Sequence, residues 1–436
     1  MENLILFIIS LVAGALCFGF LIYELVRFCK KRNLGQEVYK VDSKYRSMFI
    51  AFIAGQGALA LLSCFGLKIG YKWDMVPGDV AMMIIGSLLF GSGFACLVSS
   101  FALYYYRPDL EPHQRKIARI LTFVCAGVFV LGIYLMTQGI ADYLRYPLPN
   151  SISFKTLFGY PIKGDYGFTI AFYGILIVSG ALISYFVSDH YFYKKFKKHG
   201  ILETLLLVAF PAGLIGARLW FCLVLEPATY TANPLLIFDV RSGGMAIQGG
   251  ALFGIVFGVL FMLRFRKYVD IRFAIDVIVP TILIAQAVGR LGNFFNCEVH
   301  GNPVAIESWS LLPRIFANNL KWSSEAGIAP DGTIFLPLFF IEGLSNLVGY
   351  FIIRYAISKP LRKWLPIGSQ AALYVSWYGL TRIILEPLRY GAFEYGQSWI
   401  TAWVMLGVGI LLLGVFTLWN YFSYKKTGVW KTFENV

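Results

Sequence analysis

The densest group of polar residues lies within residues 289–301, at the end of an apolar run that is typical of a membrane span. Arg290 is followed there by Asn293, Asn296 and Glu298. A lone arginine near the end of a span is explained by a side chain that reaches the lipid headgroups. Two amides and a carboxylate within about two helical turns instead favour a site for an anionic ligand.

A second group of charged residues ends a later apolar run. Arg382, Glu386 and Arg389 are spaced i, i+4 and i+7, so one face of a helix brings the glutamate close to both guanidinium groups. The alternative is an ion-pair network with a purely structural role. Arg218, in the motif Gly216-Ala217-Arg218, is a third arginine within an apolar run, and it could equally be structural.

Three arginines near one face of a membrane predict a phosphate clamp. A guanidinium group matches phosphate oxygens in a bidentate way and stays charged when it is partly desolvated. At that depth the obvious phosphate belongs to a phospholipid. The stretch from Gly243 to Gly250 places Gln248 beside Gly249 and Gly250. Its glycines either let two helices pack closely or leave bare backbone for a headgroup to approach.

Composition predicts an all-α polytopic membrane protein. The 436 residues are 58% hydrophobic and 14% charged, and their mean hydropathy is +0.67, outside the range of ordinary soluble domains. Eleven segments are long and apolar enough to cross roughly 30 Å of hydrocarbon. We place them near residues 3–28, 48–70, 80–105, 117–138, 167–188, 201–224, 245–263, 273–295, 336–357, 368–386 and 398–421.

The basic residues indicate how the chain is oriented. Lysine and arginine cluster after every odd-numbered span, as in 30–46 and 194–198, so all clusters fall on one side. That side is cytoplasmic, which places the N-terminus outside and the C-terminus inside. This topology explains the formal charge of +14, and a nucleic-acid partner is not needed. The seven cysteines lack metal-ligand spacing. Only Cys297, beside the polar residues, is a candidate nucleophile.

These residues resemble the bacterial prolipoprotein diacylglyceryl transferases. The family pattern G-R-x-G-N-F-x-N-x-E-x-x-G is matched at every fixed position from Gly289 to Gly301. Further family motifs recur in order at Phe172-Tyr173-Gly174, Gly216 to Arg218, Gly243 to Gly250, Pro337 to Glu342, and Tyr378 to Arg389. The resemblance covers roughly residues 165–425, which hold seven spans. We expect an N-terminal four-helix extension (1–140), an external linker (141–166) and a seven-helix transferase-like domain (167–436).

The resemblance implies transfer of a diacylglyceryl group from phosphatidylglycerol to the lipobox cysteine of a prolipoprotein signal peptide. The reaction would take place at the outer leaflet of the bacterial plasma membrane, without metal or organic cofactor. Arg290, Arg382, Gln248 and Tyr173 are the implied catalytic residues. The implied substrate-binding residues are Asn293, Asn296, Glu298, Gly301, Gly249, Gly250, Glu386, Arg389, Arg218 and Glu342. The sequence does not indicate an oligomeric state.

Two positions depart from the family pattern. Gln248 replaces a histidine, and an amide cannot exchange a proton near neutral pH. The family motif at Pro337 to Glu342 has a tyrosine directly before the glutamate, and this chain has Ile341 there. His300 is either a proton acceptor from another direction or an interfacial ring. An active transferase, a divergent relative that binds phospholipid or uses another acceptor, and an amphiphile transporter therefore stay open. Transport is disfavoured because the sequence concentrates polar groups at the outer ends of the spans.

Overall fold

The computed structural model describes residues 76–106, 111–144, 146–153, 169–196, 200–238, 244–310, 312–390 and 395–435. The predicted spans 3–28 and 48–70 lie outside these residues. The chain forms two compact units. The first comprises residues 1–148, 303–322 and 327–335, and the second comprises 149–302, 323–326 and 336–436.

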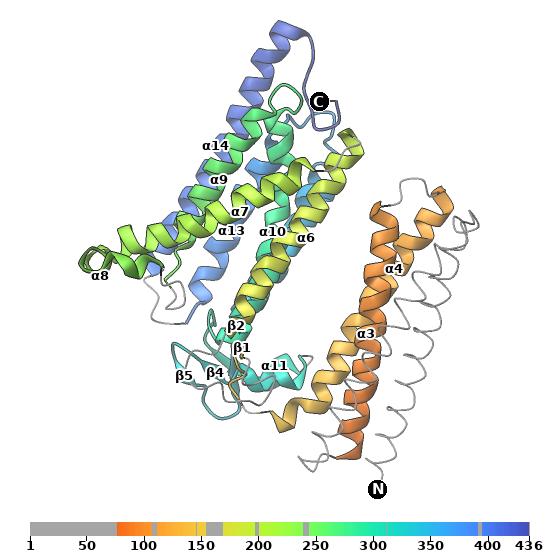
Figure 1. Cartoon of the computed structure of the whole chain (residues 1–436), viewed down its shortest axis with the longest axis vertical. Helices are drawn as coiled ribbons and strands as arrows, with labels where there is room; N and C mark the ends of the chain where they lie inside the picture. The colour runs from red at the N-terminus through yellow and green to blue at the C-terminus, as the bar shows by residue number, and fades with distance from the viewer. Residues whose placement is uncertain are drawn as a thin grey trace, which may run out of the picture. The chain divides into compact units, whose positions relative to one another are not determined.

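Two long helices pack along each other in the first unit. They are α3 (Pro77–Tyr106) and α4 (Pro112–Ile140), drawn in orange in Figure 1. Glycines allow the close approach. A methyl group on Gly86 would lie 2.2 Å from the backbone nitrogen of Met136, and one on Gly132 would lie 2.1 Å from that of Phe90. Small residues at a helix crossing are typical of membrane helices, which gain no hydrophobic energy from meeting each other in lipid.

The first unit also includes a segment that lies far away in the sequence. Arg314 donates to the side chain of Gln138 over 2.9 Å and to its carbonyl over 2.8 Å, and it pairs with Asp142. The backbone nitrogen of Leu148 donates to Asn319 over 2.8 Å. The short elements are η1 (Ala141–Tyr143), β3 (Pro303–Ala305), η5 (Ile306–Trp309), α11 (Arg314–Asn319), β4 (Trp322–Ser323), β5 (Gly327–Ile328) and β6 (Thr333–Phe335). Strand β3 pairs antiparallel with β6.

The second unit is a bundle of helices. Strands β1 (Ser151–Ser153) and β2 (Thr169–Ala171) pair antiparallel before it. Its elements are α6 (Phe172–Phe196), α7 (Ile201–Trp220), η2 (Phe221–Leu225), α8 (Pro227–Ala232), η3 (Pro234–Phe238), α9 (Ile247–Arg264), α10 (Ile271–Asn296), α12 (Leu338–Phe351), η6 (Ile352–Ile357), α13 (Ser369–Leu385), η7 (Glu386–Leu388) and α14 (Tyr395–Thr427).

Helix α10 is the centre of this bundle. It packs against α6, α12 and α13, while α7 packs against α9 and α13 against α14 (Figure 1). Its first turn is capped by Asp270, whose carboxylate accepts a hydrogen bond from the backbone nitrogen of Arg272 over 2.9 Å. Its Phe273 and Val277 join Phe192 of α6 in a buried apolar cluster. Helix α10 therefore holds its neighbours in register.

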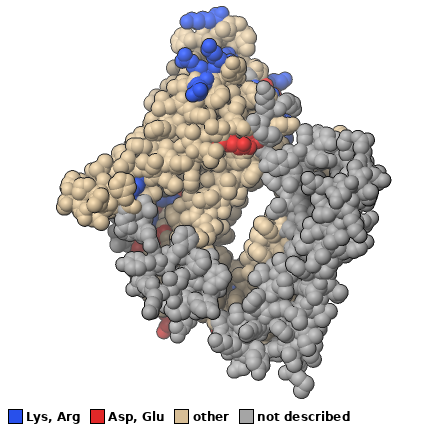
Figure 2. Space-filling view, viewed as in Figure 1, with Lys and Arg blue, Asp and Glu red and all other residues tan. Residues whose placement is uncertain are grey.

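The helices fit a multi-pass membrane protein. Within the described residues, α4, α6, α7, α10, α12 with η6, and α14 are long and apolar enough to cross a bilayer, and α3 and α9 contain shorter apolar stretches. Each of the nine predicted spans from 80–105 onwards overlaps a helix, and the count of eleven spans stays a prediction. Figure 2 shows Lys and Arg side chains gathered at the end of the second unit where α14 finishes with Lys425 and Lys426. Exposed apolar residues such as Leu207, Ile255 and Leu411 fit contact with lipid.

Candidate functional site

A buried glutamate joins two arginines from different helices. Glu342 of α12 has only 2% of its side chain exposed. Its Oε1 atom pairs with Arg290 of α10 and lies 3.8 Å from Nη1 of Arg382 of α13. The two arginine side chains keep 23% and 18% of their surface exposed. Two cations therefore converge on one carboxylate and still offer donors to an incoming anion.

A second buried carboxylate extends this cluster. Glu386, which is 3% exposed, lies 3.0 Å from Nη2 of Arg382 and 3.6 Å from Nη1 of Arg389. This arrangement confirms the pairing that the i, i+4 and i+7 spacing predicts. Arg382 also donates to the hydroxyl of Ser398 in α14 over 3.0 Å. The cluster holds three cations against two carboxylates, so it has one excess positive charge that a bound anion would neutralise.

The end of α10 turns its polar residues onto one carboxylate. Cys297 adopts a left-handed conformation with φ of 51°, which ends the helix and lets the chain fold back. Glu298 then accepts hydrogen bonds from Asn293 over 2.8 Å and from Asn296 over 3.0 Å. The structure thus brings these three predicted residues together one to two turns beyond Arg290. Cys297 itself is buried.

Tyr173 lies against the same end of α10. A methyl group on Gly292 would stand 2.3 Å from the Tyr173 ring, so only glycine lets α6 approach this closely. The ring of Phe172 stacks on that of Phe295 with centroids 4.5 Å apart. Both contacts place the start of α6 beside the turn that carries Arg290.

Gly301 connects the loop after α10 to Arg389. The two residues form an antiparallel bridge, and the backbone nitrogen of Gly301 donates to the carbonyl of Leu336 over 2.9 Å. A methyl group at Gly301 would lie 2.7 Å from the Leu388 carbonyl oxygen. The backbone contact therefore explains why this position is glycine.

The glycine stretch is built into a helix crossing. A methyl group on Gly249 would meet the carbonyl oxygen of Gly216 in α7 at 2.2 Å, and one on Gly250 would lie 3.3 Å from that of Gly213. Close packing of α9 on α7, one of the two sequence interpretations, accounts for both glycines. Gln248 is exposed at the start of α9.

Arg218 makes a different set of contacts from the other arginines. Its guanidinium group donates to the carbonyl oxygens of Ile237 over 3.0 Å, Gly244 over 3.0 Å and Leu236 over 2.7 Å. Its guanidinium carbon lies 5.3 Å from the centroid of the Tyr230 ring. These contacts tie η3 and Gly244 to α7, and none of them in the described part of the chain reaches the Glu342 cluster.

His300 is a buried ring in the loop that follows α10. Its imidazole packs edge-on against Phe339 with centroids 5.9 Å apart. Burial lowers the pKa of His300 from 6.5 to about 4. The ring is therefore neutral at pH 7, which is the protonation state of a proton acceptor.

Buried polar groups in the described spans also lie at the ends opposite to the arginine cluster, in addition to the concentration that the sequence predicts at the outer ends. Asp276, Arg354 and Gln370 are buried at the opposite ends of α10, the α12–η6 segment and α13. Each stands alone in its own apolar run, so the sequence offered no local signal for the group. Ser398 was missed for the same reason.

Long apolar helices, with a partly exposed pair of arginines on Glu342 where α10, α12 and α13 meet, define a multi-pass membrane protein. The sequence model of the prolipoprotein diacylglyceryl transferases matches residues 161–420. The chain belongs to this family of transferases.

Curated relatives carry the name phosphatidylglycerol–prolipoprotein diacylglyceryl transferase. One from Clostridium botulinum (strain Langeland) is 31% identical over 257 residues, covering 59% of this chain and 94% of the relative. One from Clostridium novyi (strain NT) is 33% identical over 270 residues, covering 60% and 97%. One from Mycoplasmopsis pulmonis is 33% identical over 271 residues, covering 59% and 80%.

Proposed function

We propose that this protein transfers a diacylglyceryl group from phosphatidylglycerol to the lipobox cysteine thiol of a prolipoprotein. The observation that carries the proposal is the convergence of Arg290 and Arg382 on Glu342, with both guanidinium groups still partly exposed. The names of the curated relatives support these two substrates.

The arginines suit the part of the reaction in which charge develops. A sulfur–carbon bond forms at the glycerol carbon while the bond from that carbon to the phosphate oxygen breaks. Glycerol phosphate leaves with one more negative charge, which the thiol proton balances. Arg290 and Arg382 stabilise that charge, and a low-dielectric site strengthens the effect. The thiol belongs to the acceptor, so the reaction needs no cysteine of the enzyme.

The remaining site residues orient this pair or the headgroup. Glu342 holds both arginines in place before lipid binds, and Glu386 sets Arg382. Arg389 adds a third cation to the clamp. Tyr173 contacts the headgroup from the start of α6. Asn293, Asn296 and Glu298 form the polar wall that meets the glycerol hydroxyls.

Gln248 serves as a binding residue in this proposal. Its amide can donate to a phosphate or hydroxyl oxygen but cannot take up a proton. Gly249 and Gly250 position this side chain through the α7–α9 crossing, and Arg218 holds the carbonyl oxygen of Gly244 just before it. Proton transfer therefore does not pass through this position.

We place the site at the outer leaflet of the bacterial plasma membrane, with the N-terminus outside and the C-terminus cytoplasmic. Lys194 and Lys195 end α6 and Lys425 and Lys426 end α14, at the ends of these helices that become cytoplasmic. Phosphatidylglycerol and a secreted signal peptide meet at the opposite face.

The test is transfer from labelled phosphatidylglycerol to a lipobox peptide by the purified full-length protein, read by mass spectrometry. Arg290→Gln should lower the transfer rate about 100- to 1000-fold, as for loss of a charge-stabilising donor. Arg264→Gln, an exposed arginine at the end of α9, is the matched control and should keep the rate. Cys297→Ser should also keep it. A peptide modified as fast by Arg290→Gln as by the control would refute the clamp.

Gln248, at the position where the family pattern has histidine, favours one alternative, a divergent relative that binds phospholipid without this transfer. Folded protein that retains phosphatidylglycerol but never modifies the peptide would support that alternative.

A further inference from the structure

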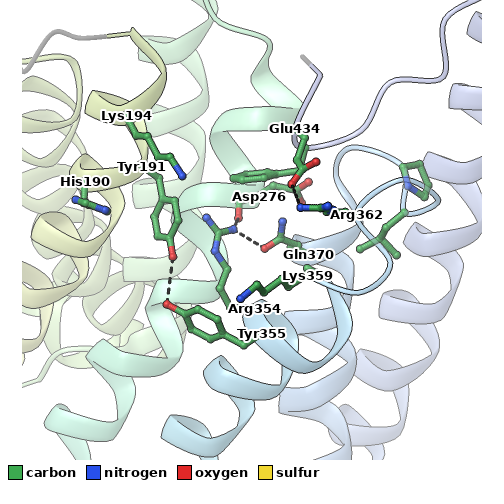
Figure 3. Close-up of a pocket in the computed structure, with 14 residues that line it drawn as sticks. His190, Tyr191, Lys194, Asp276, Arg354, Tyr355, Lys359, Arg362, Gln370 and Glu434 are labelled. Atoms are coloured by element: carbon green, nitrogen blue, oxygen red, sulfur yellow. Dashed lines mark hydrogen bonds and ion pairs between the residues drawn. The ribbon is translucent and has the colours of Figure 1, made fainter. Parts of the chain in front are cut away.

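A cavity of about 390 Å³ lies at the opposite ends of the helices that carry the arginine cluster. Figure 3 shows Tyr191 and Lys194 of α6, Asp276 of α10, Arg354 of η6 and Gln370 of α13 around it. Asp276 and Arg290 are 14 residues apart on α10, which is about 21 Å along a helix. The cavity is therefore separate from the proposed active site, and its volume suits a small ligand.

Arg354 is fixed in this cavity with one donor unused. It is 7% exposed, and its guanidinium carbon lies 3.8 Å from the ring centroid of Tyr191 and 4.4 Å from that of Phe433. Its Nη1 donates to Gln370 over 2.5 Å. Its Nη2 is buried and has no hydrogen-bond partner among the described residues. Burying a donor that makes no hydrogen bond destabilises the fold. The geometry therefore indicates that an acceptor from outside the chain binds here.

Asp276 does not fill that role. Its carboxylate accepts hydrogen bonds from the backbone nitrogens of Gly368 over 2.6 Å and Ala371 over 3.1 Å. It is thereby committed to the start of α13. Nη1 of Arg354 instead donates to the main-chain carbonyl oxygen of Asp276 over 3.5 Å.

The other polar groups on the cavity wall are mostly donors. Ser358 has a buried hydroxyl with no partner in the described part of the chain. Lys194 and Lys359 line the cavity, and no ion pair within the described ranges engages either ammonium group. Arg362 also lines it and pairs with Glu434 over 3.3 Å. The cavity wall thus holds four cations and two carboxylates. Nη2 of Arg354 and the hydroxyl of Ser358 are also available as donors, and these groups together suit a ligand with several acceptor oxygens.

We propose that this cavity binds a phosphate group, carried either by an anionic lipid headgroup or by a free phosphate. Arg354 donates through Nη2, Ser358 donates through its hydroxyl, and Lys194 and Lys359 supply the compensating charge. The site is additional to the proposed transferase function and does not depend on it.

The first experiment measures thermal unfolding of the full-length protein in detergent, titrated with sodium phosphate against sodium chloride of equal ionic strength. Lys194→Gln with Lys359→Gln tests the cavity, because neither substitution removes a described ion pair. Lys425→Gln with Lys426→Gln, at the end of α14, is the matched control. Wild type and control should gain stability with phosphate, and the cavity variant should need roughly tenfold more phosphate for the same gain.

The second experiment identifies the source of the phosphate. The protein is placed in phosphatidylcholine nanodiscs with or without phosphatidylglycerol, and retained lipids are counted by native mass spectrometry. If a lipid supplies the phosphate, the cavity variant retains one fewer phosphatidylglycerol than wild type. If free phosphate is the ligand, the counts agree and only the titrations differ. A cavity variant that matches wild type in both experiments overturns the proposal, whatever the outcome of the transferase assay.

Discussion

Replacing Glu342 by glutamine should destabilise the second unit. In the described part of the chain, Glu342 is the only carboxylate that pairs with Arg290. At 3.8 Å, the pair with Arg382 alone is worth about 4 kcal/mol at an effective dielectric of 20. Partial exposure of both arginines lowers the net effect, so we expect a loss of about 3 kcal/mol, the lower end for a broken buried pair. For a unit of this size that corresponds to roughly 6 °C in the melting temperature.

The assay is thermal unfolding of the purified protein in a neutral detergent, with and without added phosphatidylglycerol. Glu203→Gln is the matched control, because Glu203 is exposed and accepts a hydrogen bond from Tyr185 that glutamine can also accept. Phosphatidylglycerol should raise the melting temperature of Glu342→Gln more than that of wild type, since its phosphate replaces the lost charge. A variant that melts within about 1 °C of the control would refute the assignment of Glu342 as the residue that holds the arginines.

Three further outcomes follow from the same contacts. Gly292→Ala should cost about 1–3 kcal/mol of stability, because its methyl group would collide with the Tyr173 ring; Gly289→Ala, which meets nothing within 4 Å, should cost nothing, and equal melting temperatures would contradict the packing. The pKa of His300 is about 4 when folded and 6.5 when unfolded, so the unfolded chain binds more protons in this window and stability falls as the pH drops through it. His300→Gln should flatten the unfolding free energy between pH 6.5 and 4, by roughly 3 kcal/mol in total, and an unchanged slope would rule this out. Gln248→His should retain or raise peptide transfer, whereas a strong loss would mean that the site is rebuilt around the amide.

Local patterns predicted the helices and the contacts within them. The span placed at 273–295 coincides with α10 at Ile271–Asn296, because length and hydropathy are properties of one segment. The pairing of Arg382 with Glu386 also followed from helical spacing. The link from Arg290 to Glu342 spans 52 residues, so helix packing and not local sequence creates it. The group of Asp276, Arg354 and Gln370 could not be predicted from the sequence for the same reason.

The division of the chain was predicted only in outline. The sequence placed a linker at 141–166, and the domain boundaries proposed from it stay a prediction. Residues 303–322 and 327–335 group with the first unit, although they lie inside the part that matches the family. Nothing in their composition marks them as belonging there, because the contacts of Arg314 with Gln138 and Asp142 connect positions more than 170 residues apart.

Because residues 303–322 and 327–335 belong to the first unit, the N-terminal extension and the transferase part are hard to separate. An engineer who shortens the protein to the 161–420 match would leave Arg314 and Asn319 without the partners that residues 138–148 supply. The curated relatives from the two clostridia align over 94% and 97% of their own length with about three fifths of this chain. The segment after α10 therefore contacts the N-terminal region through hydrogen bonds as well as through the chain itself, and a cut between the two parts would break both connections.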